Sequence, residues 1–182
     1  MPLPPNVFIP DAKPYFEWVR GKLHQKVSPS LGHGRLQAKI GAILLAWGEE
    51  RGCVAVEHDL NVTPEPGDTR RYLPDVEFIS YDALEAAGQL HEQIPEIAPE
   101  LGIEILSPHD DQRYLADKVA AYLRAGSRVI IVVDPKVRSF TVHRGNGRID
   151  VLRGDDVFTD DAFPGLRLEL PAIFRVLDNP RR

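Results

Sequence analysis

The run RVIIVVD at residues 128–134 constrains the fold more than any other stretch of the chain. Its interior is made entirely of Val and Ile, yet it is far shorter than the ~20 apolar residues that span a bilayer. A short strand that is apolar on both faces has to be covered on both faces, as in sheets with helices packed on either side. We therefore expect a chain built around a central sheet.

Two amphipathic helices are expected to provide that cover. Between His33 and Arg51, ahead of Gly52, apolar residues recur at helical spacing: Leu36, Ile40, Ile43, Leu44 and Trp47. A second helix is expected over residues 110–126, ending at Gly126. Its apolar face consists of Leu115, Val119, Tyr122 and Leu123. Near the start, YFEWVRGK at 15–22 predicts a short helix and KLHQKVS at 22–28 a short strand.

The other segments predict strands and turns. Alternation and β-branched residues favour strands over 53–64, 72–80 and 101–107, with turn residues over 65–71 and a short helix and loop over 80–98. A Gly-Asn-Gly turn predicts a hairpin over 139–153, and 163–177 predicts a strand and a short terminal helix. The expected fold class is α/β, bordering on α+β, with helices on the faces of one mixed central sheet.

Composition narrows the class of protein. With 182 residues, 43% of them hydrophobic, we expect a single globular domain over 1–182 that begins with a loose N-terminal arm at 1–11. No apolar stretch could cross a membrane, and the Pro-rich start lacks a signal-peptide pattern, so a cytoplasmic location is expected. The single cysteine, Cys53, excludes disulfides and thiolate-rich zinc sites. The net charge of -5 means that any DNA contact must come from a local patch.

Glu104 is out of place in its segment. It interrupts LGIEILS, with Ile103 and Ile105 on the opposite strand face. Because an unpaired buried carboxylate costs several kcal/mol, it should be protonated, paired or bound to a cation. A structural ion pair or a half-exposed edge strand would also explain it.

Two more residues could join Glu104. Asp75 follows Pro74, which suits a strand start or an edge, and shares a strand face with Glu77. Lys118 flanks the apolar face of the 110–126 helix and could bury its stem while carrying its ammonium toward the neighbouring strand, although a solvated lysine is an equal alternative. Two carboxylates can hold Mg²⁺ and an ammonium can stabilise charge on a phosphate, so the trio suits metal-assisted phosphodiester cleavage.

Four segments together resemble a known family: FEWVRGKLHQKVSPSLGHGRLQ, YLPDVEFIS, PELGIEILSPHDDQRYLADKVAAYLRAGSRVIIVVDP and FPGLRLELPAIF. Over nearly its whole length the chain resembles the Uma family of restriction-endonuclease-like proteins, in the PD-(D/E)XK nuclease superfamily. The resemblance implies a restriction-endonuclease-like fold with Asp75 and Glu104 as the two motif acids and Glu17 completing the acidic cluster. It also implies a magnesium-dependent endonuclease, with Mn²⁺ able to substitute, acting on DNA.

The chain departs from the superfamily pattern at two positions. Leu106 stands where the lysine of (D/E)XK is expected, and Lys118 looks like its migrated replacement, placed to orient or activate water. Tyr114 stands where many relatives carry an aspartate, which we expect to weaken the hydrogen-bond network. His33 matches a histidine of the family and could contact a phosphate or serve as a general acid, or simply stand at a helix start.

Nucleic-acid contacts are expected from scattered basic residues: Arg35, Lys39, Arg70, Arg71, Arg113 and Arg124. Ser107 and Asp111 could support the metal ligands, but capping of the following helix is the favoured interpretation. A homodimer would suit cleavage of two strands.

Other functions are less well supported. Signatures of nucleotide binding, dinucleotide binding, serine hydrolysis and zincin chemistry are missing, so no nucleotide cofactor is expected. A glycosidase using Asp75 and Glu104 would need an aromatic sugar platform, and aromatics are sparse around them. The rival hypothesis is a catalytically inactive relative that keeps the fold as a DNA-binding or protein-interaction module.

Overall fold

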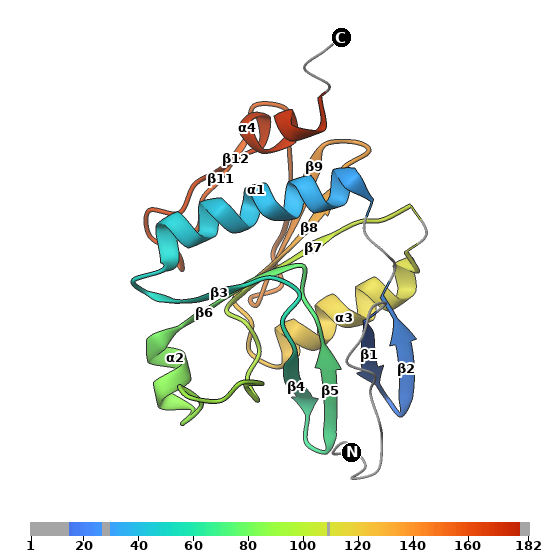
Figure 1. The fold of residues 1–182 in the computed structure, drawn as a ribbon, viewed down its shortest axis with the longest axis vertical. Coiled ribbons are helices and arrows are strands. Elements are labelled where there is room, and N and C mark those ends of the chain that lie inside the picture. Colours follow the sequence, from blue (N-terminus) through green and yellow to red (C-terminus); the bar gives the residue numbers. More distant parts are fainter. Residues whose placement is uncertain (1–14, 27–29, 109, 179–182) are drawn as a thin grey trace.

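The structure is a computed structural model that describes residues 15–26, 30–108 and 110–178 (Figure 1). The expected arm at 1–11 lies outside this part of the chain. The helices are α1 (Leu31–Gly48), α2 (Tyr81–Ala86), α3 (Gln112–Arg124), α4 (Leu170–Phe174) and the 3-10 helix η1 (Arg175–Leu177). The strands are β1 (Phe16–Val19), β2 (Lys22–Gln25), β3 (Gly52–Ala55), β4 (Leu60–Glu65), β5 (Asp68–Tyr72), β6 (Val76–Ser80), β7 (Leu101–Ile105), β8 (Val129–Asp134), β9 (Ser139–Arg144), β10 (Ile149–Arg153), β11 (Val157–Phe158) and β12 (Leu168–Glu169).

The central sheet has six strands in the order β10-β9-β8-β7-β6-β3. Strands β7 and β8 are parallel and the other neighbours are antiparallel, so the sheet is mixed, as expected. The apolar run that predicted it forms β8, which is buried from Val129 to Val133. Helix α1 lies along one face of this sheet and α3 along the other (Figure 1). The fold class predicted from the sequence is confirmed.

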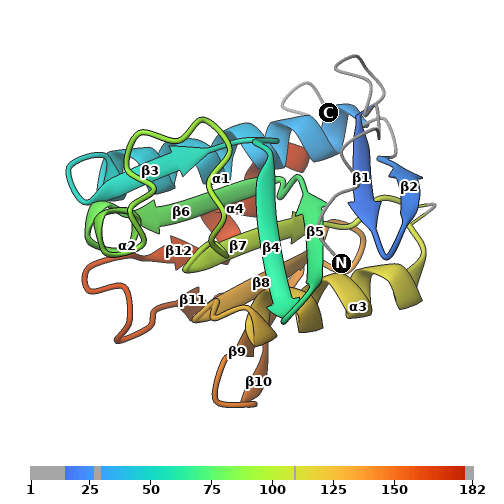
Figure 2. The ribbon, with the colours of Figure 1, turned by 90° about the horizontal axis from the view of Figure 1, so that it is seen from below.

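A second sheet, of four strands in the order β2-β1-β5-β4, was not expected (Figure 2). The helix predicted over 15–22 is wrong, because Arg20 and Gly21 adopt positive φ angles of 47° and 80° and turn the chain back into a hairpin. The strand predicted over 53–64 is broken near Glu57, whose φ is 49°, and its two halves belong to different sheets. The turn expected over 65–71 is shorter, since Asp68 already begins β5.

Both long helices begin at side-chain caps. Ser30 Oγ accepts a hydrogen bond from His33 N, so α1 starts at Leu31, two residues before the expected position, and it ends at Gly48 rather than Arg51. Asp111 accepts from the backbone N–H groups of Arg113 and Tyr114 and starts α3, which confirms its expected capping role. The hairpin over 139–153, the short helix within 80–98 and the terminal strand and helix are also confirmed.

The pairing of β6 with β7 determines which residues face α3. Val76 pairs with Ile103 and Glu77 with Gly102. Ile103 and Ile105 belong to the core beneath α1, whereas Ile130 and Val132 of the neighbouring β8 belong to the core beneath α3. Since side chains alternate, Glu104 points toward α3. Strand β7 lies between β6 and β8, so the edge-strand explanation for Glu104 is wrong.

Within the described residues, no helix has both the length and the apolar character that crossing a membrane requires.

Candidate active site

Glu104 and Lys118 form a buried ion pair between β7 and α3. Lys118 Nζ lies 2.7 Å from one carboxylate oxygen of Glu104 and 2.8 Å from the other. Their exposed fractions are 6% and 3%, so the predicted burial of the lysine stem is confirmed. Burial raises the pKa of Glu104 to about 7, despite the opposing effect of Lys118. Burial alone would lower the pKa of Lys118, but the carboxylates of Glu104 and Glu17 raise it above its usual range.

Asp75 stands beside Glu104 at the start of the neighbouring strand. Its backbone N–H donates to the Ile103 carbonyl at 3.1 Å, which extends the β6–β7 pairing by one residue and places Asp75 opposite Glu104. Asp75 Oδ2 also accepts a 2.7 Å bond from the Ile105 backbone N–H. The strand predicted from residue 72 begins at Val76, directly after Pro74-Asp75, as the strand-start interpretation requires.

Glu17 joins the cluster from β1. One carboxylate oxygen accepts from Lys118 Nζ at 2.7 Å and from Leu73 N at 2.9 Å, and the other accepts from the Tyr114 hydroxyl at 2.5 Å. Burial alone would raise the pKa of Glu17, but Lys118 and its other donors lower it. The expectation that Tyr114 weakens the network is wrong, because its hydroxyl takes part in it.

Lys26, which the sequence did not single out, completes the cluster. Its Nζ donates to Asp75 Oδ1 at 2.7 Å and to the Leu73 carbonyl at 2.9 Å. Burial alone would raise the pKa of Asp75, but Lys26 and His33 lower it below its usual range. A lysine at the end of a predicted strand carries no signal of its own. Recognition of the β1–β2 hairpin would have placed Lys26 next to Tyr15 and close to Glu17.

His33 faces the same group from the first turn of α1. Its Nε2 lies 3.4 Å from Asp75 Oδ1, and its Nδ1 lies 3.3 Å from Ser107 Oγ. Nε2 is buried and makes no hydrogen bond to any described residue. The imidazole is therefore held between the Asp75 carboxylate and the Ser107 hydroxyl. Ser107 supports this ring instead of capping α3.

The residues expected to contact nucleic acid are not all accessible. Arg35 and Arg113 are exposed, as contacts with DNA would require, and Lys39 is half-buried. Arg124 lies 3.6 Å from Glu65, and Arg71 is held by Asp59. The expectation for Arg70 is wrong, because its side chain is fully buried and bonds to Asp68, Asp117 and Tyr72.

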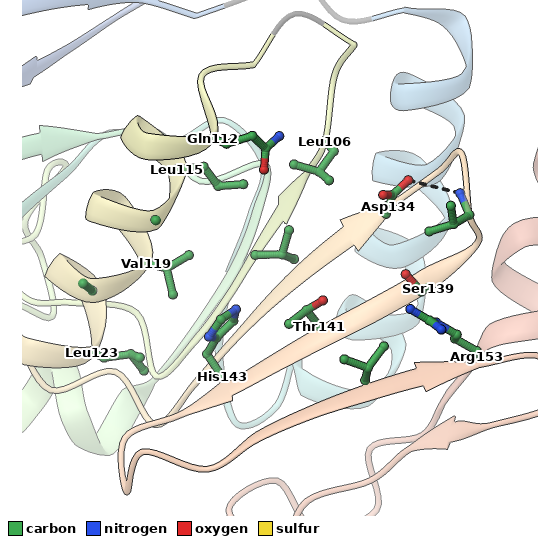
Figure 3. Close-up of a pocket in the computed structure, with 15 residues that line it drawn as sticks. Leu106, Gln112, Leu115, Val119, Leu123, Asp134, Ser139, Thr141, His143 and Arg153 are labelled. Carbon is green, nitrogen blue, oxygen red and sulfur yellow. Dashed lines mark hydrogen bonds between the residues drawn. The ribbon is translucent and has the colours of Figure 1, made fainter.

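A pocket of about 240 Å³ opens onto the cluster. Asp75, Glu104 and both lysines line it, together with His33 and Tyr114. A larger cavity of about 480 Å³ lies between α3 and strands β8–β10, where Leu115, Val119 and Leu123 face Thr141 and His143 (Figure 3). Its walls are mostly apolar and hold none of the clustered carboxylates, so the smaller pocket is the candidate active site.

The donor set suits a hard divalent cation. Asp75 and Glu104 offer carboxylate oxygens from adjacent strands, and oxygen ligands are the ones that Mg²⁺ prefers. His33 Nε2 lies 3.4 Å from Asp75 Oδ1 and makes no hydrogen bond to a described residue, so this nitrogen could still take part in binding at the same point. Among the residues that the structure describes, no three His, Cys, Asp or Glu side chains are grouped closely enough to hold a metal ion. Lys26 and Lys118 supply positive charge beside the two acids, and a bound cation would add to it.

Comparison with known proteins agrees with this architecture. No curated protein matches the chain. Among solved structures, it is similar to one described as a "putative nuclease belonging to DUF820" from Anabaena variabilis, with a TM-score of 0.81 and 22% identity over 93% of this chain and 94% of that one. This likeness shows a shared fold. The profile of the Uma2 family, described as "Putative restriction endonuclease", matches residues 8–171. The chain therefore belongs to the Uma2 family, and the resemblance seen in its sequence is confirmed.

Proposed function

We propose that this protein is a metal-dependent endonuclease that hydrolyses phosphodiester bonds in DNA. The observation that carries the proposal is the meeting of Asp75 and Glu104 on adjacent strands, buried beside two lysines and open to a pocket. Membership of a family described as restriction endonucleases supports the same reaction class. Titratable groups with shifted pKa values gathered in a cleft are typical of active sites.

Asp75 and Glu104 would hold the divalent cation, Mg²⁺ or Mn²⁺. When bound, the cation would supply Lewis-acid stabilisation of the phosphate and a more acidic water. Lys118 keeps the Glu104 and Glu17 carboxylates in place through its own short contacts. Glu17 is in turn fixed by Leu73 N and Tyr114, so it positions the lysine and does not itself need to reach the substrate.

The reaction itself is hydrolysis. The oxygen of water bonds to phosphorus, and the bond from phosphorus to one sugar oxygen breaks. One proton of the water passes to the leaving sugar oxygen, and the products are a phosphomonoester and an alcohol. The phosphate gains negative charge as the water adds, so a positively charged group in the pocket would lower the barrier.

Cleavage of plasmid DNA tests the proposal. Wild-type protein should nick or linearise plasmid with Mg²⁺ or Mn²⁺ and not with EDTA, and Asp75→Asn should lower the rate by at least about 100-fold. The matched control is Glu77→Gln, a buried acid on the same strand face that pairs with His58 at a distance of 2.9 Å. Equal rates for wild type and Asp75→Asn, or no cleavage by wild type, would refute the proposal.

Calorimetry distinguishes an enzyme from a catalytically inactive relative with the same fold. An active site should bind Mn²⁺ with an affinity that falls in Glu104→Gln, whereas an inactive DNA-binding or interaction module should show no binding that depends on Glu104. We also propose a homodimer, since two sites would cut the two strands of a duplex. Light scattering at the concentrations used for cleavage tests this directly.

A further inference from the structure

The site contains two lysines, Lys26 and Lys118, that differ in how many ammonium N–H groups remain available to a ligand. An ammonium group has three N–H bonds to donate. The proposed reaction adds negative charge to the phosphate, and either lysine could in principle meet that charge. Their contacts distinguish them.

Lys118 has no donor left. Its Nζ donates to Glu17 at 2.7 Å, to Glu104 at 2.8 Å and to the Leu73 carbonyl at 3.3 Å. Its side chain is 3% exposed, with its Nζ within 6 Å of the Tyr72 and Tyr122 ring centres, at 5.6 and 5.9 Å. A phosphate oxygen could reach this ammonium only if a buried ion pair were broken first, which is strongly unfavourable.

Lys26 is in the opposite situation. Among the described residues its Nζ has two acceptors, Asp75 Oδ1 and the Leu73 carbonyl, so one N–H is unused. The side chain is 17% exposed and lines the pocket beside both motif acids. Its own backbone N–H is fixed by the Tyr15 carbonyl at 2.8 Å, which anchors the base of the side chain.

We propose that Lys26 is the catalytic cation of this site, donating its unused N–H to a non-bridging oxygen of the DNA phosphate, and that Lys118 is a positioning residue. The inference rests on the proposed nuclease function. It assigns the role of the missing motif lysine to the β1–β2 hairpin instead of α3. Negative charge that develops on the phosphate would be met by a group that is already directed at the pocket.

DNA binding without metal gives a readout independent of cleavage. A duplex oligonucleotide is titrated in EDTA across a salt series by fluorescence anisotropy, with wild type, Lys26→Met and Lys22→Met. Lys22 is the matched control, a lysine at the start of β2 that is exposed and does not line the pocket. Loss of one phosphate contact should make the slope of log K against log salt shallower by about 0.9 in Lys26→Met. A slope equal to that of Lys22→Met would overturn the proposal.

Cleavage by the same variants completes the test. Lys26→Met should cleave about 100-fold more slowly than wild type with Mg²⁺, and Lys22→Met should match wild type. If Lys26→Met does not fold, Lys26→Gln keeps a neutral donor for Asp75 and should show the same loss. If wild type cleaves and both Lys26 variants cleave as fast, the inference fails while the nuclease assignment stands. If wild type neither binds nor cleaves DNA, the nuclease assignment fails.

Discussion

The two faces of strands β6 and β7 are both buried, but one carries apolar side chains and the other carries charged ones. Toward α1 they present Val76, Phe78, Ile103 and Ile105, which pack into an apolar core. Toward α3, one residue out of phase, they present Asp75 and Glu104, equally buried but surrounded by charge. The same backbone pairing positions both sets. Packing on the α1 face therefore fixes the pairing of the two strands, and this pairing keeps the two acids next to each other on the α3 face.

This contrast bears on stability. Apolar burial stabilises a fold by roughly 25 cal/mol per Å² removed from water. A buried ion pair often contributes no more than an apolar pair of equal volume, but loss of one partner is costly. The three carboxylates of Glu17, Asp75 and Glu104 against two ammonium groups leave a formal excess of negative charge. A cluster with this charge imbalance is not expected to stabilise the fold, so a functional role explains its presence better.

The largest expected effect is on the α3 face, from Lys118→Ala. The substitution leaves Glu17 and Glu104 buried without their shared ammonium, so the free energy of unfolding at pH 7 should fall by about 3–5 kcal/mol. Urea denaturation measures it. Lys22→Ala, at an exposed position of β2, should stay within about 0.5 kcal/mol of wild type. A loss below about 1 kcal/mol in Lys118→Ala would show that the cluster is not tightly coupled.

The α1 face should respond differently to Ile103→Ala. Ile103 is fully buried in the apolar core, and its truncation should cost about 3 kcal/mol by lost burial and the cavity left behind. Urea denaturation and the cleavage rate per folded molecule are measured together. The rate should be unchanged, because Ile103 belongs to the apolar core and does not line the pocket. A large loss of rate with a small loss of stability would contradict the separation of the two faces.

The sequence predicts correctly those features that depend only on which face of a strand or helix a residue occupies. Because side chains alternate along a strand, the sequence predicts that Glu104 points to the other face of its strand from Ile103 and Ile105. The helical spacing predicts that Lys118 lies beside the apolar face of α3. The resemblance to the Uma family added Glu17, which no pattern in the chain would have joined to the other acids.

Sequence reasoning failed where a residue's role depends on a distant contact. Arg70 was expected on the surface, but Asp117 of α3, 47 residues away in sequence, receives its guanidinium in the interior. Nothing local in the sequence indicates the role of Lys26, because its partner Asp75 is 49 residues away and the pattern over 15–28 predicts a helix and a strand where the chain forms a hairpin. Propensity cannot reveal such pairings, since they depend on how sheets assemble.

Glu104→Gln should change how the stability of the protein depends on pH. The folded pKa of Glu104, about 7, lies above its ordinary value of 4.5, so wild-type stability falls as pH rises from about 4.5 to 7 and the acid ionises. Gln removes this pH dependence, so the stability of the variant relative to wild type should rise by about 3 kcal/mol between pH 4 and pH 8. Urea denaturation across this pH range measures it. A stability difference between variant and wild type that is the same at pH 4 and pH 8 would show that Glu104 does not ionise in this range.

Tyr114→Phe is the mildest test of whether the polar face acts as one unit. It removes only the hydroxyl that donates to Glu17, while the ring can keep its stacking on His24 at 4.5 Å between centroids. A hydrogen bond to a charged group contributes about 1.5 kcal/mol, so stability at pH 7 should fall by about that amount. Glu17 has a lowered folded pKa, so the stability it contributes is present above its unfolded value and lost at lower pH. The deficit should therefore shrink in acid. Tyr81→Phe, whose hydroxyl donates to an exposed carbonyl, should show neither the loss nor its pH dependence, and equal behaviour of the two variants would separate Tyr114 from the cluster.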